Sequence, residues 1–195
     1  MSHTEEIAAA AACLVVDEGM EYGAAKKKAA RGFGARTELP SNEQLEDAVR
    51  EHIAVFCADT QPAELQALRQ VALRWMGRLA EYRPHLSGAV WRGTATRLSA
   101  VHIDLYCDDP KAAEITLINA GVDYDSGDLP RPGRDPLIVL TVGDPSRELG
   151  ELVTVHLMLH DADDQRGALK PDARGRSWRG DARALHHLMQ ETDTP

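Results

Sequence analysis

One segment, residues 86–107, constrains the fold more than any other part of this chain. It begins at Leu86, reaches a turn of small residues at Gly88, and bends again at Arg92-Gly93. After Ser99 the chain alternates apolar and polar residues, which is the pattern of a half-buried β-strand. The segment therefore predicts a strand–turn–strand unit with Gly88 at the turn.

The chain before this segment shows helical spacing instead, so we expect an N-terminal helical region over 1–83. Helices are predicted over 4–18, over 24–33, from Ser41 and from Thr60. Ser41 is followed three residues later by Gln44, which together make a capping box. The apolar stripes expected to be buried on the last two helices are Leu45, Val49, Ile53 and Phe56, then Leu65, Leu68, Ala72, Trp75, Met76 and Leu79.

The pattern changes period after Pro84, and residues 84–195 are predicted to form a second domain. Turn-forming residues separate its strands and helices. Strands are predicted over 86–91, 100–107, 137–142 and 152–159, helices over 110–120 and 181–190, and loops over 121–134 and 161–180. Strands mixed with helices in this way indicate an α/β (α+β) fold class.

Composition limits the classes of protein to which the chain can belong. Its 195 residues are 43% hydrophobic and 27% charged, and a net charge of −9 argues against a nucleic-acid platform over the whole surface. Cys13, Cys57 and Cys107 are far apart and odd in number, which predicts reduced thiols in a cytoplasmic protein. No apolar run approaches the roughly 20 residues that span a bilayer, and the first residues lack a basic signal-peptide region, so no membrane association is expected.

The segment 86–107 resembles the signature loop of the DNA polymerase β-like nucleotidyltransferase superfamily, in its minimal nucleotidyltransferase type. That loop is typically Gly-Ser-x-x-Arg-Gly-x-(Ala-Thr)-x-x-Ser-Asp-x-Asp-Leu. The matching residues here are Gly88, Arg92, Gly93, Ala95, Thr96 and Ser99. Ala100 and His102 stand where the family has its two metal-binding aspartates. The resemblance covers about residues 84–160 and implies a nucleotidyltransferase-like mixed sheet flanked by helices.

The resemblance also implies a phosphate cradle at the turn. Proteins of this family bring the backbone N–H groups of a Gly-Ser turn to the triphosphate, and a Cβ atom on the glycine would obstruct that approach. Gly88, Ala89, Arg92 and Gly93 are therefore the expected nucleotide-binding residues. Ala89 lacks the hydroxyl of the family's serine but keeps its N–H group.

Catalysis in this superfamily requires two divalent cations held by three carboxylates. Neither Ala100 nor His102 supplies a carboxylate, and the predicted strands 137–142 and 152–159 contain none. We therefore expect a nucleotidyltransferase-like protein with a degenerate catalytic centre and a residual cleft for a nucleotide or phosphate.

Two alternatives remain open. His102, Asp104 and His156 could hold a divalent transition metal as a cofactor, because imidazole and carboxylate ligands suit Zn²⁺, Fe²⁺ or Mn²⁺. The protein would then be an active transferase with His102 and Asp104 as catalytic residues, although alternating polar residues ordinarily mark only the wetter face of a sheet. The second alternative is a ligand-free interaction module that binds a protein partner or a second copy of itself.

Two clusters of basic residues could contact phosphate groups. One comprises Lys26, Lys27, Lys28, Arg31 and Arg36, and the other comprises Lys170, Arg174, Arg176, Arg179 and Arg183 around Trp178. A solvated face that balances an acidic protein is the favoured interpretation of the first cluster. The second would line the mouth of a cleft or belong to a mobile loop.

Overall fold

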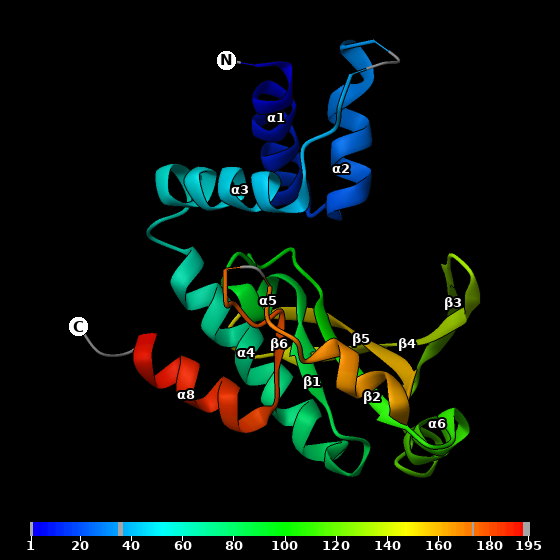
Figure 1. Cartoon of the computed structure of the whole chain (residues 1–195). Coiled ribbons are helices and arrows are strands. Elements are labelled where there is room, and N and C mark those ends of the chain that lie inside the picture. The colour runs from blue at the N-terminus through cyan, green and yellow to red at the C-terminus, as the bar shows by residue number, and fades with distance from the viewer. Residues whose placement is uncertain (1, 35–36, 173, 193–195) are drawn as a thin grey trace. The chain divides into compact units, whose positions relative to one another are not determined.

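The computed structural model describes residues 2–34, 37–172 and 174–192 (Figure 1). The chain divides into two compact units. The helical unit comprises Met1–Leu65 and Thr94–Ser99, and the sheet unit comprises Gln66–Gly93 and Ala100–Pro195. The division falls within helix α4 (Gln61–Arg78) and not near Pro84, and it places part of the signature loop in the helical unit.

Three helices and a short 3-10 turn build most of the helical unit. They are α1 (His3–Glu18), α2 (Tyr22–Ala29), η1 (Ala30–Gly32) and α3 (Asn42–Phe56). Figure 1 shows α1 and α2 side by side, with α3 crossing α1. Small and branched residues fill the space between these helices: Ala11, Ala12, Val16, Ala25, Leu45, Val49 and Ile53.

Local capping fixes where the two long helices of this unit begin. The Ser41 hydroxyl accepts a hydrogen bond from the backbone N–H of Gln44 at 3.1 Å, and the Gln44 side chain accepts one from the Ser41 N–H at 2.8 Å. Ser2 and Glu5 form the same reciprocal pair at the start of α1. The predicted capping box at Ser41 is confirmed, because it depends only on residues within one turn.

The predicted stripe on α3 is confirmed at Leu45, Val49 and Ile53 but is wrong at Phe56. Phe56 is 71% exposed, because α3 ends at this residue. The Phe56 ring lies beside the His52 ring, with centroids 4.7 Å apart. The predicted stripe on α4 is buried throughout: Leu65, Leu68, Ala72, Trp75, Met76 and Leu79.

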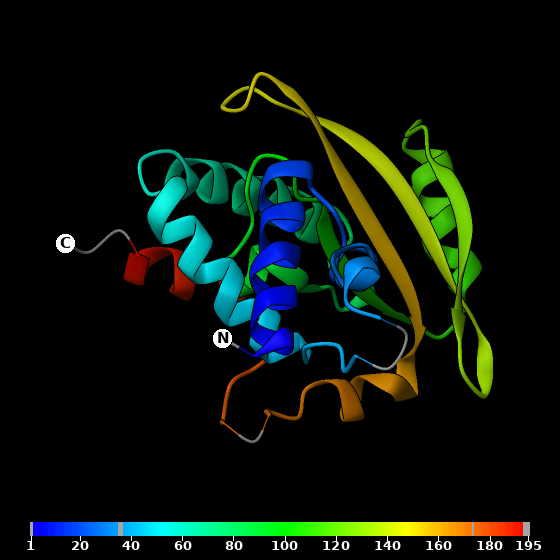
Figure 2. The same cartoon turned by 90° about the horizontal axis from the view of Figure 1, so that it is seen from above.

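The sheet unit contains a six-stranded sheet in the order β3-β4-β5-β2-β1-β6. Its strands are β1 (His85–Ser87), β2 (Val101–Cys107), β3 (Asp125–Arg131), β4 (Arg134–Ser146), β5 (Glu151–Asp161) and β6 (Arg179–Gly180). β2 and β5 are parallel, and the other neighbours are antiparallel. Figure 2 shows β4 and β5 as two long neighbouring strands. The predicted α+β class with a mixed sheet flanked by helices is confirmed.

The sheet unit also contains helices, some of which pack on the sheet. They include η2 (Ala80–Tyr82), α5 (Gly88–Arg92), α6 (Pro110–Asn119), η3 (Ala162–Asp164), α7 (Gln165–Ala168) and α8 (Ala182–Thr192). α6 packs on β2 and β5 with Ala113 and Leu117 buried, and α8 packs on β1 and β6. Arg69 of α4 is buried and donates to the carbonyl oxygens of Val90 and Trp91, which satisfies the end of α5.

Three predicted elements differ from the structure. The strand predicted over 86–91 ends at Ser87, because Gly88 has φ +71° and the chain continues as α5. The loop predicted over 121–134 contains β3, which pairs with β4. Six of the seven residues of β3 are exposed, so no alternation of buried and exposed residues marked it as a strand. The loop predicted over 161–180 contains η3, α7 and β6.

Within the described ranges, none of the helices combines the length and apolar character that a bilayer crossing requires.

A close approach at Gly180 gives a test of this packing. A Cβ atom added at Gly180 would lie 2.2 Å from the Trp91 ring, so the ring would have to move. We expect Gly180→Ala to lower the free energy of unfolding by about 1–3 kcal/mol, the usual cost of overpacking. Urea denaturation measures this change.

The matched control is Gly127→Ala, where nothing lies within 4 Å of the added Cβ. Its stability should change by less than about 0.5 kcal/mol. Equal stabilities of the two variants would show that the Trp91 ring does not pack against Gly180.

Candidate functional site

The signature segment folds as a one-turn helix between two glycines that need a positive φ. Gly88 opens α5 with φ +71°, and Gly93 caps it with φ +86°. Ala89 and Arg92 lie within this turn, so the four expected nucleotide-binding residues occupy six consecutive positions. Residues other than glycine rarely adopt a positive φ, which explains why glycine stands at both positions, five residues apart.

A polar face of the sheet adjoins this turn. The parallel register places His102 beside His156, Asp104 beside Met158, and Tyr106 beside His160. The opposite face carries the apolar residues Val101, Ile103 and Leu105 of β2 and Val155, Leu157 and Leu159 of β5, all buried. This confirms the predicted alternation along β2.

Asp104 lies at the centre of the polar face, and its side chain is 4% exposed. One carboxylate oxygen is 2.8 Å from His160 Nε2, and the other accepts a hydrogen bond from an Arg179 guanidinium nitrogen at 2.9 Å. The same nitrogen donates to the Tyr106 hydroxyl at 3.2 Å. A buried carboxylate needs such partners, because an unpaired charge in the interior is costly.

Tyr106 is buried between two histidines. Its ring stacks on His160 with centroids 5.3 Å apart, and it meets the His85 ring edge-on at 5.5 Å. Burial raises the pKa of Tyr106, and the negative charge of Asp104 raises it further, whereas the hydrogen bond from Arg179 opposes both effects. The phenol therefore stays protonated at neutral pH.

His102 and His156 form a second pair on this face. Their ring centroids are 5.2 Å apart, and His156 Nδ1 is 2.9 Å from the hydroxyl oxygen of Thr141. A Cβ atom added at Gly88 would lie 3.2 Å from His102 Nδ1. The predicted cradle glycine therefore lies directly against the predicted metal-binding histidine.

The structure brings the predicted metal ligands onto one face but not to one point. His102 and His156 are neighbours, whereas Asp104 is bonded to His160 and Arg179. In the described part of the chain, the one group of three His, Cys, Asp or Glu ligand atoms within 4.8 Å of one another belongs to helices α1 and α3. Ala100 is half-buried ahead of β2 and offers no ligand atom.

The C-terminal segment lies beside α5. The Trp91 indole N–H donates to the Ser177 carbonyl oxygen at 2.9 Å, and the Arg92 and Arg176 guanidinium groups lie 5.6 and 5.9 Å from the centre of the Trp178 ring. Both distances fit cation–π contacts. The second basic cluster thus contributes Arg176 and Arg179 to the surroundings of the predicted site.

Two lysines of the first basic cluster make local contacts. Lys26 donates to the Pro40 carbonyl oxygen and to the Asn42 side chain, and Lys28 pairs with Glu18 at 2.7 Å. Arg36 lies outside the described residues. These pairings agree with a solvated face.

The rest of the signature loop is held by side chains of α4. Gln61 donates to the Ala95 carbonyl oxygen at 2.8 Å, and Glu64 accepts from the Arg97 N–H at 2.9 Å. Ser99, the serine of the motif, accepts a hydrogen bond from the Thr96 N–H and closes the turn. Ser99 therefore stabilises the turn through a hydrogen bond within the loop.

A separate pocket of about 360 Å³ opens at the other end of β2. It is lined by Cys107, Asp108, Arg134, Asp161, Ala162, Asp163 and Asp164. Hydrogen bonding from Arg134 lowers the pKa of Asp164, and burial raises the pKa of Cys107 to about 11. Cys107 lies five positions after His102 on β2, a distance of about 17 Å along a strand. In addition, the acidic side chains that line the pocket disfavour phosphate. This pocket is therefore distinct from the predicted cleft.

Sequence reasoning missed the two partners of Asp104. Arg179 appeared only as a member of a basic cluster, and His160 only as a residue on the same face as His156. They lie 75 and 56 residues from Asp104 in the chain, and no local pattern signals a pairing over that distance.

No protein-family model and no curated protein matches this chain. Among solved structures, one similar chain is that of Cid1 in complex with the UTP analog UMPNPP, with 16% sequence identity and a TM-score of 0.37. The match covers 57% of this chain and 37% of that one, so this chain spans well under two thirds of its neighbour's length. At this TM-score the likeness assigns no function.

Proposed function

We propose that the sheet unit is a nucleotidyltransferase-like domain that binds the phosphates of a nucleotide and lacks the two-metal centre of that superfamily. The observation that carries this proposal is the pairing of Asp104. Both of its oxygens have partners, His160 on one and Arg179 on the other. Two-metal catalysis needs carboxylate oxygens that bind cations, and a buried carboxylate already paired with an arginine is poorly suited to that role.

The charge on the polar face supports an anionic ligand. Asp104 is the one carboxylate among positions 102, 104 and 106 of β2 and 156, 158 and 160 of β5. Arg92 and Arg176 lie against the Trp178 ring, and Arg179 is bonded to Asp104. In addition, Arg179 Nε is buried and has no hydrogen-bond acceptor among the described residues, and a buried donor of this kind favours a ligand oxygen or an ordered water.

The turn at Gly88 supports the location. It brings backbone close to His102 without an intervening side chain, and it places Arg92 one turn further on. Arginine recognises phosphate oxygens through paired N–H groups. We assign Gly88, Ala89, Arg92 and Gly93 to the phosphate-binding role.

The first test of this function is nucleotide binding measured by calorimetry, with UTP, ATP, CTP and GTP in turn and no added metal. We expect the wild type to bind at least one of them. Arg92→Ala should weaken binding by about tenfold or more, the value of a charge-assisted hydrogen bond. Gly88→Ala should weaken it as well, because the added Cβ crowds His102 and the φ is strained.

Arg78→Ala serves as the matched control, since Arg78 is an exposed arginine near the end of α4. Its nucleotide affinity should equal that of the wild type. Absence of binding by the wild type, or equal affinity in the Arg92 and Arg78 variants, would contradict the proposed site.

The second test concerns the metal centre. We expect no Mg²⁺ binding by the wild type in calorimetry and no incorporation of labelled nucleoside monophosphate. The double variant Ala100→Asp, His102→Asp adds two carboxylates but lacks the third, so weak Mg²⁺ uptake without robust transfer is expected. Tight Mg²⁺ binding and incorporation by the wild type would overturn the degenerate centre.

A second candidate function rests on the proximity of His102 and His156, whose ring centroids are 5.2 Å apart. Two imidazoles at this spacing suit a transition metal such as Zn²⁺ or Mn²⁺, with Asp104 as the nearby carboxylate. The protein would then be an active transferase with His102 and Asp104 as catalytic residues. In that case Mn²⁺ or Zn²⁺, but not Mg²⁺, would support nucleotidyl transfer. The variant His156→Ala would lose this activity.

A further inference from the structure

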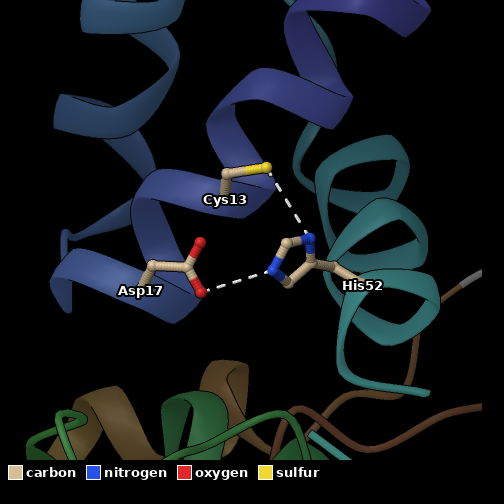
Figure 3. A group of neighbouring side chains, drawn as sticks. All are labelled: Cys13, Asp17 and His52. Carbon is tan, nitrogen blue, oxygen red and sulfur yellow. Dashed lines mark hydrogen bonds and ion pairs between the residues drawn. The ribbon is translucent and has the colours of Figure 1, made fainter. Parts of the chain in front are cut away.

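A second group of ligand-type side chains lies in the helical unit. Cys13 and Asp17 come from α1, and His52 comes from α3 (Figure 3). Each offers one ligand atom, and these atoms lie within 4.8 Å of one another. Figure 3 shows the His52 ring directed at α1, between the thiol and the carboxylate.

The geometry of this group follows from two packed helices. Cys13 and Asp17 are four residues apart, so their side chains share one face of α1. Val16 of α1 and Val49 and Ile53 of α3 are buried in the core beneath, which fixes the distance between the two helices. His52 precedes Ile53 and is therefore held at the edge of this interface, with its side chain 13% exposed.

The two nitrogens of the imidazole face different partners. His52 Nδ1 is 3.6 Å from the Cys13 sulfur, and His52 Nε2 is 3.4 Å from an Asp17 carboxylate oxygen. A tetrahedral zinc ion with bonds of about 2.3 Å to sulfur and 2.0–2.1 Å to nitrogen separates those two ligand atoms by about 3.5 Å. The separation of the Cys13 sulfur and His52 Nδ1 therefore matches that of two ligands of one zinc ion.

The donor set selects the kind of cation. Thiolate sulfur binds Zn²⁺ and other thiophilic ions and is a poor ligand for Mg²⁺ or Ca²⁺, whereas imidazole and carboxylate are both common zinc ligands. The thiol and the carboxylate are exposed, so a metal ion can reach them from solvent.

We propose that Cys13, Asp17 and His52 form a zinc site that links α1 to α3, with the remaining coordination position open to water. Cys13 binds as the thiolate and releases its proton when the metal enters. The ion binds one nitrogen of His52: at Nδ1 it replaces the 3.6 Å contact with Cys13 by direct bonds across the interface between the helices. The exposed Asp17 carboxylate then turns from Nε2 to the ion as the third ligand. Metal binding then stabilises the helical unit, since the separated ligands of an unfolded chain hold the ion less well.

Cobalt(II) titration of the full chain tests the site, because Co²⁺ substitutes for Zn²⁺ and reports thiolate ligation through a charge-transfer absorption band. We expect this band to appear with Co²⁺ alone and to disappear when Zn²⁺ is added. Cys13→Ser should abolish the band. Asp17→Asn and His52→Gln should each weaken Co²⁺ binding roughly ten- to a hundredfold or more.

The matched control is Cys57→Ser, which removes the other cysteine of the helical unit. The band should keep its intensity in this variant, and Mg²⁺ should not displace the Co²⁺. Circular dichroism of each variant shows whether the helices are retained, and protection of Cys13 from alkylation by Zn²⁺ gives an independent measure of the same ligation.

Two results would overturn the proposal. The first is a thiolate–Co²⁺ band that is absent in the wild type or persists in Cys13→Ser. The second is rapid alkylation of Cys13 that depends on His52 but does not change with Zn²⁺, since this would identify His52 as the base of a reactive thiol and not as a metal ligand.

Discussion

A carboxylate buried in the sheet is the constraint on which the polar face of the sheet unit depends. The Asp104 side chain is 4% exposed, and a charge at such a position is tolerated only with close partners of opposite charge and well-placed hydrogen bonds. Arg179 and His160 supply them. The pairing of the two-residue strand β6 with β1 sets Arg179 opposite Ser87, within reach of Asp104.

The parallel pairing of β2 with β5 arranges the rest of that face. Because side chains alternate along a strand, one register sets both the apolar core on one face and the rows of histidines on the other. The same register keeps His156 beside His102 and leaves Asp104 beside Met158. This face of the sheet therefore carries two adjacent imidazoles, His102 and His156, and one salt-bridged carboxylate, Asp104.

Local interactions explain which parts of this structure could be predicted from the sequence. The start of α3 and the buried face of α4 follow from caps and apolar spacing, which act within a few residues. β3 could not be predicted, because its side chains are exposed and its backbone pairs with β4. Within the candidate site, the turn at Gly88 was predictable, whereas the partners of Asp104 were not. The proximity of Cys13 to His52 likewise depends on how two helices cross.

The helical unit is built from two separate stretches of the chain, and this affects the order in which the chain folds during synthesis. Gln61 and Glu64 find their partners, the Ala95 carbonyl oxygen and the Arg97 N–H, 34 and 33 residues later. A nascent chain that ends anywhere before these partners leaves the start of α4 without them. The N-terminal helices can fold as soon as they leave the ribosome, whereas the start of α4 gains these hydrogen bonds only once β1 and α5 have also been made.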